Sequence, residues 1–409
     1  METKNVIAAI ALSSAVIVLY SLFFIPEKST INENLAEKDK IEQNDDAPSL
    51  EKKETLVQIS REDALEQSER VQFENEKIIG SISLKGASID DLTFKDYNTT
   101  LESNKKIILL GPRNTESGYL IESGFVTSDK NIDIPNSDSI WSVTGNNKLT
   151  NKSPIKLSWT NNQGVKFEKE ISLDEKYLFT INQSVINSTD KKYDFYAYGQ
   201  IIRNKIPEIS NFYILHEGLI ATLDDELIEE DYDDIQEKKF SRTSQKGWLG
   251  ISDKYWITSL IPSKGKEFKT TFDYKKKFRA NFIATEPLEL KGKNKVEEKL
   301  QIIIAAKRVD IIDGYAESLN IDKFDLVIDW GFLYFITKPL FFGIDYFFKL
   351  LGNYGLAIIA ITICIRLAFF PLANFSFRSM AKMKALQPEM VRLKELHKED
   401  KMKLQQEMM

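Results

Sequence analysis

The stretch from Tyr354 to Ala373 constrains this chain more than any other, because it is apolar except for one permanently charged side chain. Its centre reads AIIAITICIRLAFFPL, and the charge belongs to Arg366. About 20 such residues in a helix cross roughly 30 Å of hydrocarbon. The sequence therefore predicts a membrane helix over residues 353–373.

Two interpretations of Arg366 are open. About seven apolar or small residues follow it, which places the charge on the order of 10 Å from the helix end, within reach of the membrane surface. In that case the side chain pins the end of the helix. Alternatively, the guanidinium faces a water-filled cavity inside the membrane and attracts anionic groups. Thr362, one turn earlier, lies on the same face and makes that side polar.

A second apolar run, VIAAIALSSAVIVLYSLFFI, extends from Val6 to Ile25 and has the length of another membrane helix. A secretory signal peptide is the alternative, but its apolar core is usually shorter, and no small-x-small cleavage motif follows this run. We therefore predict a retained anchor helix over residues 1–26. The polar stretch 27–70 has too few apolar residues to offset the entropy of ordering, which predicts a flexible tether, with a polar helix as the alternative.

Between about Val71 and Leu300, hydrophobic and polar residues alternate with the period of a β-strand. In KYLFTINQSVIN, for example, Tyr177, Phe179 and Ile181 share one face. Short runs of this kind recur between Gly, Asn, Asp and Pro residues. We expect a large antiparallel β-sandwich over residues 71–320.

Two features of this region allow a sharper interpretation. The dense acidic run at 224–234 has carboxylates enough for calcium, but it lacks the central glycine and the ligand alternation of an EF-hand, so we expect a solvated loop. Five large aromatic residues are expected in the core rather than around a sugar-binding cleft. They are Trp141, Trp159, Trp248, Tyr255 and Trp256.

Composition argues against several functional classes. One cysteine and two histidines are too few for a disulfide scaffold or a Cys/His zinc site. With 55 basic and 61 acidic residues, the net charge of −6 does not predict nucleic-acid binding. Phosphate-binding-loop and nucleophile-elbow motifs are also absent from the sequence. We expect no cofactor and no metal.

Residues 321–352 are rich in aromatic and aliphatic side chains but carry several charges, so they are a poor candidate for one straight membrane crossing. An amphipathic helix at the membrane interface, ended by Pro339, is predicted, and a buried soluble helix is the alternative. Trp330 and Tyr334 suit the headgroup level. Asp345 and Lys349, four residues apart, are expected to pair on a second helical stretch.

The polar C-terminal stretch indicates orientation. Residues 378–409 favour helix and hold eight Lys and Arg residues against five Asp and Glu residues. Positive residues this close to a membrane helix belong in the cytoplasm, so the sandwich is expected on the outer side. Apolar residues recur here at helical spacing and predict the seam of a helical hairpin, with a methionine-rich substrate surface as the alternative. They are Met380, Met383, Leu386, Met390 and Leu393.

Four motifs, in this order along the chain, resemble the YidC family of membrane protein insertases of Gram-negative bacteria. They are GWLGISDKYWITSLIP, LVIDWGFLYFITKPLF, GNYGLAIIAITICIRLAFFPL and SFRSMAKMKALQPEM. The resemblance runs from the first helix to the last residue. It implies a bacterial inner-membrane protein with an anchor helix, a periplasmic β-supersandwich similar to sugar-binding folds, an interfacial helix, a second membrane helix and a cytoplasmic helical hairpin.

The resemblance also implies residue roles. In such insertases a single arginine sits in a hydrophilic groove and receives the polar tail of a nascent membrane protein, and the arginine of that motif matches Arg366, with Thr362 beside it. Met380, Lys382 and Met383 match the cytoplasmic hairpin, which engages substrate or ribosome. The implied partners are nascent membrane proteins, the lipid bilayer, the Sec translocon and the ribosome. No bond-making chemistry is expected.

Because the family continues with the rest of the hairpin, over 374–409 and beyond, and with further membrane helices, the sequence is expected to be a truncated form. Two other functions are open as alternatives. One is a membrane-anchored periplasmic carbohydrate-binding or carbohydrate-modifying protein, which predicts exposed aromatics and paired carboxylates in one cleft. The other is a scaffold that docks onto the Sec translocon without inserting substrate.

Overall fold

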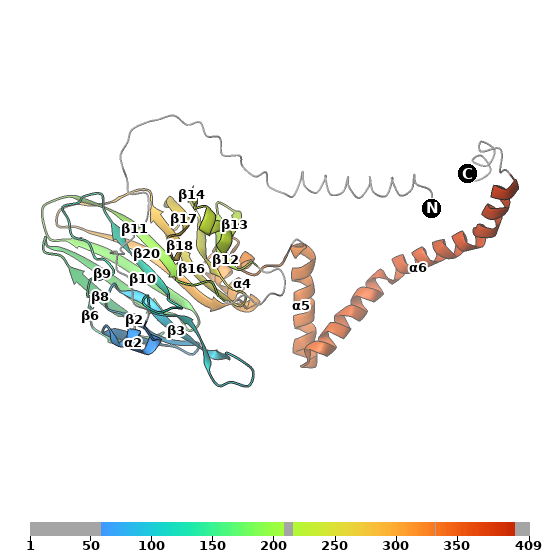
Figure 1. Ribbon diagram of the computed structural model, residues 1–409, viewed down its shortest axis with the longest axis horizontal. Coiled ribbons are helices and arrows are strands. Elements are labelled where there is room, and N and C mark those ends of the chain that lie inside the picture. The colour runs from blue at the N-terminus through green and yellow to red at the C-terminus, as the bar shows by residue number, and fades with distance from the viewer. Residues whose placement is uncertain (1–58, 208–215, 332, 397–409) are drawn as a thin grey trace, which may run out of the picture. The chain divides into compact units, whose positions relative to one another are not determined.

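The structure is a computed structural model that describes residues 59–207, 216–331 and 333–396. The predicted anchor helix at 1–26 and most of the predicted tether at 27–70 lie outside the described residues. Within the described part, two β-sheets form a large sandwich, which helices α4, α5 and α6 follow in the chain (Figure 1).

Eleven strands form the first sheet of the described chain. Nine of them follow one another in a main path, while β19 pairs with β11 and β4 pairs with β3 outside this path. In spatial order the main path is β14 (Phe240–Ser244), β17 (Phe268–Tyr274), β18 (Phe278–Ala284), β11 (Tyr193–Arg203), β5 (Tyr119–Val126), β3 (Ser88–Asn98), β2 (Ile78–Ser83), β1 (Arg70–Glu74) and β7 (Lys148–Leu149). The side strands are β19 (Leu288–Leu290) and β4 (Lys106–Leu110).

The second sheet has nine strands among the described residues. In spatial order they are β13 (Glu226–Asp231), β12 (Gly218–Leu223), β15 (Gly247–Ser252), β16 (Trp256–Ile261), β20 (Lys295–Ala306), β10 (Leu178–Asn187), β9 (Val165–Leu173), β8 (Ile155–Thr160) and β6 (Ser142–Thr144). The predicted sandwich is confirmed. Its sheets are mixed rather than purely antiparallel, because β1 and β7 pair in parallel.

Aromatic side chains join the two sheets across the core. Phe73 of β1 meets Phe179 of β10 edge to face with ring centres 5.1 Å apart, and Phe94 of β3 stacks on Trp256 of β16 at 4.6 Å. The predicted face formed by Tyr177, Phe179 and Ile181 is confirmed, since all three are buried. Edge-to-face and offset pairs of this kind add to the free energy gained from burial alone.

The predicted loop at the acidic run 224–234 is wrong, because residues 226–231 form strand β13 and residues 232–237 form helix α3 (Tyr232–Glu237). Apolar residues that alternate with the carboxylates explain why this segment forms regular structure instead of a loop. Tyr232 and Ile235 are buried in the core, and Leu227 and Ile228 pack against it. The carboxylates of β13 instead line an outer edge of the sheet, where charge discourages pairing with another chain.

The prediction that the large aromatics lie in the core is confirmed for Trp141 and Trp248, which are buried. Trp159 and Trp256 are half-buried and pack against the core. For Tyr255 the prediction is wrong, because this side chain, directly before β16, is 60% exposed.

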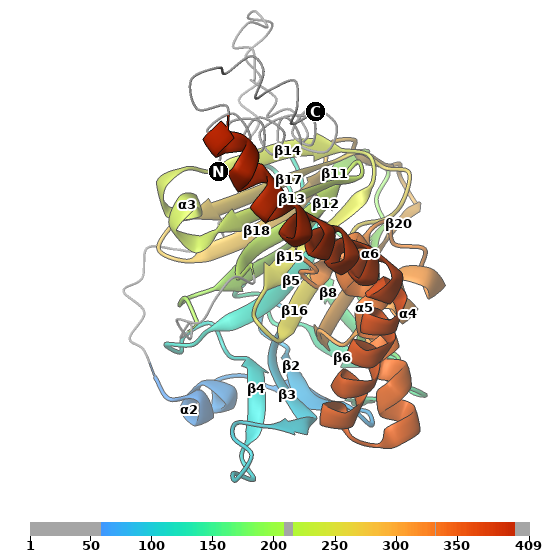
Figure 2. The ribbon, with the colours of Figure 1, turned by 90° about the vertical axis from the view of Figure 1, so that its right-hand side faces the viewer.

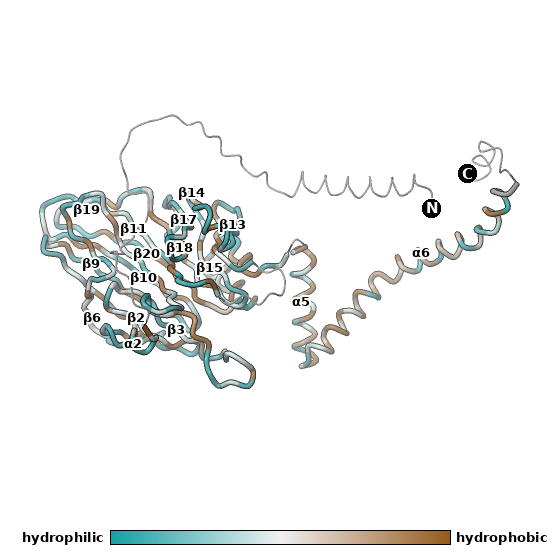
Figure 3. The backbone as a smooth tube through the Cα atoms, viewed as in Figure 1, coloured by the Kyte–Doolittle hydropathy of each residue, from teal (hydrophilic) through white to brown (hydrophobic). Residues whose placement is uncertain are grey.

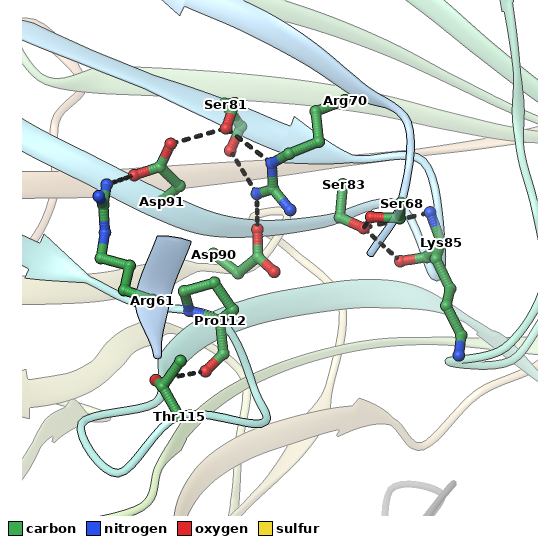
Figure 4. A network of polar contacts seen from close by, with 10 residues as sticks. All are labelled: Arg61, Ser68, Arg70, Ser81, Ser83, Lys85, Asp90, Asp91, Pro112 and Thr115. Carbon is green, nitrogen blue, oxygen red and sulfur yellow. Dashed lines mark hydrogen bonds and ion pairs between the residues drawn. The ribbon is translucent and has the colours of Figure 1, made fainter. Parts of the chain in front are cut away.

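A polar network ties the start of the described chain to the sandwich (Figure 4). Helix α2 (Arg61–Glu66) lies inside the stretch assigned to the tether, and Arg61 forms an ion pair with Asp91 of β3. Arg70 donates to Ser81 Oγ over 2.8 Å and pairs with Asp90. Burial raises the pKa of Asp90, and the nearby charge of Arg70 opposes that rise.

Beyond the sandwich the chain is helical, through α4 (Val309–Ser318), a short 3-10 turn η1 (Phe324–Val327), α5 (Tyr334–Leu351) and α6 (Tyr354–Leu396). Pro339 does not end a helix as predicted but lies within the first two turns of α5. Proline in a helix removes only one backbone hydrogen bond, here the one that Phe335 O would accept, and the helix continues past it.

Residues 353–373 and 374–396 were assigned to separate elements, whereas α6 runs through both without a break. Pro371 stands at this boundary inside the helix and removes only one backbone hydrogen bond, so the helix-favouring sequence on both sides continues across it. At about 1.5 Å per residue, α6 is about 65 Å long, twice the thickness of the hydrocarbon layer.

Candidate functional site in helices α5 and α6

A tight turn joins α5 to α6. Gly352 has a left-handed backbone with φ +67°, which a glycine adopts at little cost, and its N–H donates to Phe348 O over 2.8 Å. Asn353 then caps α6 by accepting the N–H of Leu356 at Oδ1 over 3.2 Å. The two helices are therefore neighbours from the first turn of α6 (Figure 2).

Small residues let α5 and α6 pack closely. Ala357 is fully buried, and a Cβ added at Gly343 would lie 2.9 Å from Ile361 Cδ1, so nothing larger than glycine fits there without a shift. Phe348 stacks on Tyr354 with ring centres 3.9 Å apart. These contacts define the face of α6 that α5 covers.

Arg366 lies on the opposite face of α6. It follows Ala357 by nine residues, which at about 100° per residue is a rotation of about 180°. The side chain is exposed, and no ion pair or hydrogen bond joins it to any residue that the structure describes. Thr362 shares this face, one turn earlier, and its hydroxyl donates to Ile358 O over 2.7 Å.

Exposed apolar side chains surround this polar pair. Ile363 is 53% exposed, and Phe369 and Phe370 exceed 60%. In the described chain, α6 contains the one stretch, residues 354–388, that is long and apolar enough to cross a membrane. Hydropathy shifts from mostly apolar near α5 to mostly polar toward the far end of α6 (Figure 3). Arg366 and Thr362 are thus polar groups within an apolar surface.

The three residues assigned to hairpin contacts lie further along the same helix. Met380, Lys382 and Met383 are exposed on the polar half of α6. Lys382 follows Arg366 by 16 residues, which corresponds to about 24 Å along the axis. The structure brings Thr362 and Arg366 together but keeps these three residues apart from them.

Helix α5 exposes large apolar side chains to its surroundings. Tyr334, Phe335 and Tyr346 are each 58–65% exposed. The predicted pair is confirmed, because Lys349 Nζ lies 2.7 Å from Asp345 Oδ2. An apolar surface with its charges neutralised in this way suits a helix that lies in a membrane interface.

Lys338 connects α5 to the β domain, a contact that the sequence did not predict. Its Nζ lies 2.8 Å from Asp325 Oδ2 on η1 and 3.5 Å from Asp313 Oδ1 on α4. The ammonium also sits 5.7 Å from the centre of the Trp330 ring, which packs edge to face on Phe341 of α5. We call Lys338, Asp325 and Asp313 the lysine clasp. No spacing rule reveals it, because its members belong to three elements.

We expect Lys338→Met to loosen the hold of α5 on the β domain. A half-exposed ion pair contributes about 1 kcal/mol, so amide hydrogen exchange over residues 326–337 should rise about fivefold. Lys349→Met is the matched control, since Lys349 pairs with Asp345 inside α5. Equal exchange in the two variants would show that the clasp does not hold α5.

The β domain contains a small cavity beside Trp141 and Lys169, with a volume of about 20 Å³. Burial lowers the pKa of Lys169 to about 8, and its ammonium donates to Ser123 O over 2.7 Å and lies 5.0 Å from the Trp141 ring centre. This volume accommodates about one water molecule. A sugar ring does not fit into it.

The family model described as YidC periplasmic domain matches residues 70–342, and that described as 60Kd inner membrane protein matches residues 346–409. A membrane protein insertase YidC of Pelagibacter ubique is 69% identical over 409 residues, which are 100% of this chain and 73% of that protein. That of Rickettsia rickettsii is 39% identical over 99% of this chain and 73% of its own length.

Among solved structures, a galactose mutarotase related enzyme from Lactobacillus acidophilus aligns with 58% of this chain and 97% of its own. The TM-score is 0.44 and the sequence identity is 12%.

Proposed function

This chain belongs to the YidC family of membrane protein insertases, and we propose that it guides polar segments of nascent inner-membrane proteins along the Arg366 face of α6. The observation that carries this proposal is the position of Arg366. Its charge projects from an apolar helix on the side that α5 leaves uncovered.

Two physical effects make such a face useful. A polar surface within the membrane reduces the thickness of hydrocarbon that a hydrophilic segment must cross. A cation in partly dehydrated surroundings also attracts a carboxylate more strongly than it does in water, by about 3 kcal/mol at 4 Å when the effective dielectric constant is 20. The apolar segment of the substrate then enters lipid, where burial of its surface drives the step. This process needs no bond-making chemistry.

The proposed arrangement assigns each part of the chain to a compartment. Residues 1–26 anchor the protein, and the part of the predicted tether that precedes α2, residues 27–60, connects the anchor to the domain. Residues 61–327, from α2 to η1, form the periplasmic domain. Helix α5, residues 334–351, lies at the interface. Residues 353–373 cross the membrane, and 374–409 begin the cytoplasmic hairpin. The basic residues of the polar half of α6 support this orientation, because such residues stay on the cytoplasmic side.

We further propose that the exposed side chains of Met380, Lys382 and Met383 meet substrate or ribosome as it reaches the membrane. Flexible methionines adapt to varied apolar surfaces, and a lysine suits the anionic surface of a ribosome. The Sec translocon is proposed as a partner on the family resemblance alone. Carbohydrate binding gains no support from the cavity beside Trp141, which is too small for a sugar.

The sole cysteine of the chain offers a test of whether water reaches the Arg366 face. Cys364 lies two residues after Thr362, at nearly the same depth, but about 160° around the helix. We expect Thr362→Cys, made together with Cys364→Ala, to react with a water-soluble maleimide at least tenfold faster than Cys364 does in the unaltered protein.

The measurement is made on inside-out membrane vesicles that hold the full-length protein. Labelling after detergent treatment corrects for differences in intrinsic thiol reactivity. Equal, slow labelling at both positions would show a dry face at Arg366 and would remove the basis of the proposed function.

A further inference from the structure

The hairpin that joins β3 to β4 projects beyond the body of the sandwich (Figure 2). Asn98 at the end of β3 pairs with Lys106 at the start of β4, and the N–H of Thr99 donates to Lys105 O over 2.8 Å. We call residues 99–105 the hairpin tip. Because backbone hydrogen bonds order its root, the position of its side chains is set by the fold of the domain.

A leucine lies at the centre of the hairpin tip. The N–H of Ser103 donates to Thr100 O over 3.3 Å, which places Leu101 and Glu102 at the two central positions of a four-residue turn. Gly, Pro, Asn, Asp and Ser are the residues that favour such turns. Leu101 is fully exposed, so its apolar surface contributes nothing to the stability of the domain.

A single exposed leucine is common on protein surfaces, so its surroundings decide what it indicates. Tyr97, at the root of the hairpin, packs edge to face on Trp256 of β16 with ring centres 5.1 Å apart. Trp256 directly follows Tyr255, which is 60% exposed. The hairpin tip and the turn before β16 therefore present two exposed apolar residues, Leu101 and Tyr255, at one end of the sandwich.

The chain leaves the sandwich for the membrane at this same end. Arg308, at the N-cap of α4, interacts through its side chain with Tyr97, so α4 begins beside the root of the hairpin. Asp313 of α4 belongs to the lysine clasp, which holds Lys338 of α5. Helix α5 leads into α6, which contains the apolar stretch long enough to span a membrane. The hairpin thus projects from the end of the domain that α5 and α6 adjoin in the chain.

Two lysines follow the leucine. Lys105 and Lys106 are exposed, and neither side chain forms an ion pair or hydrogen bond with a residue that the structure describes. Glu102 offsets one of these charges, which leaves one positive charge over residues 99–106. An apolar side chain gains free energy by entering the acyl boundary of a membrane, and lysines beside it are attracted to anionic headgroups.

We propose that the hairpin tip contacts membrane lipid. Leu101 enters the boundary between headgroups and acyl chains, and Lys105 and Lys106 meet anionic headgroups. Tyr255 suits the headgroup level, because its ring is apolar and its hydroxyl is polar. The contact shares with the proposed function only the placement of α6 in the membrane, and it does not depend on Arg366.

Quenching by spin-labelled lipid tests this contact on the full-length protein in vesicles of phosphatidylcholine and phosphatidylglycerol. The variant Leu101→Cys, with all other cysteines replaced, carries a nitrobenzoxadiazole label. Ile140→Cys is the matched control, because Ile140 is also 60% exposed but lies at the opposite end of β3, about 34 Å along that strand. We expect quenching at position 101 to exceed that at position 140 at least about fivefold.

A third label, at Ile363→Cys, reports separately whether α6 lies in lipid. Quenching at 363 and 101 but not at 140 supports the contact. Quenching at 363 without quenching at 101 overturns the contact and leaves the placement of α6 intact. Absence of quenching at both positions overturns the contact and the proposed function together.

Amide hydrogen exchange tests the same contact without a label. In vesicles, residues 99–106 should exchange about tenfold faster in Leu101→Glu than in the unaltered protein, because the burial of a leucine in lipid is lost. Ile140→Glu should leave this exchange unchanged. Substituting Lys105 and Lys106 with glutamine should speed exchange about fivefold for each lysine when phosphatidylglycerol is present, and should have no effect in phosphatidylcholine alone.

Two results would contradict the lipid contact. Slow exchange over 99–106 without quenching at position 101 would assign the hairpin tip to another protein or a second copy of this chain. Equal exchange in Leu101→Glu and Ile140→Glu would show that the leucine contacts nothing in the membrane. If the lysine variants exchange like the unaltered protein in both lipid mixtures, the attraction to anionic headgroups is wrong.

Discussion

Substituting Arg366 with alanine is expected to reduce the insertion of a nascent protein with an acidic N-terminal tail by roughly tenfold or more. The lost attraction between the guanidinium and a carboxylate in partly dehydrated surroundings is of the order of a few kcal/mol, which would allow an even larger effect. The measurement is insertion into vesicles that contain the full-length protein, scored by protease protection of the tail.

Varying the charge of the substrate tail and of residue 366 separates the role of the Arg366 charge from general damage to α6. Insertion of a substrate with a neutral tail should fall much less in Arg366→Ala, and Arg366→Lys should retain most of the activity with the acidic tail, because it keeps the charge. Arg378→Ala, 12 residues further along the same helix, is the matched control. If acidic and neutral tails are affected equally, the guanidinium does not act by charge attraction.

Phe324→Ala is expected to lower the free energy of unfolding of the β domain by about 3–5 kcal/mol, the usual cost of removing a buried aromatic ring. The Phe324 ring is fully buried and meets Trp248 edge to face, with ring centres 5.1 Å apart. Denaturant unfolding followed by tryptophan fluorescence measures the loss. Tyr255→Ala, at an aromatic residue that is 60% exposed, should change stability by less than about 1 kcal/mol.

Phe324 also precedes Asp325, a member of the lysine clasp. Hydrogen exchange over residues 326–337 should therefore rise in Phe324→Ala even under conditions in which the sandwich stays folded. Unchanged exchange there, together with a destabilised sandwich, would show that η1 does not hold α5. A stability change near zero would contradict the packing itself.

The sequence predicted those parts of the fold that depend on local periodicity. Alternation in residues 177–181 identified a buried strand face, and the spacing of four between Thr362 and Arg366 placed both on one side of a helix. The loop predicted for the acidic run was wrong, because the prediction considered only the carboxylates. Tyr232 and Ile235, which lie among and beside them in the sequence, pack into the core.

Contacts between distant elements could not be predicted in this way. The lysine clasp joins residues 13 and 25 positions apart on three elements, and the close approach at Gly343 depends on Ile361 of another helix. A single sequence does not show which of these residues come close together in the folded chain. The Tyr255 exposure is similar, since whether an aromatic faces the core or solvent depends on how a turn meets the sheet.

The continuity of α6 across residue 373 has a mechanical consequence. Because no loop interrupts α6, the helix rotates about its axis as one rigid body. A partner that rotates the polar half of α6 therefore also rotates the apolar half. Rotating α6 about its axis by the angle of a single residue, about 100°, would turn the Arg366 side chain by slightly more than a quarter of a turn. Pro371, five residues beyond Arg366, removes one backbone hydrogen bond and is therefore the position at which α6 bends most easily.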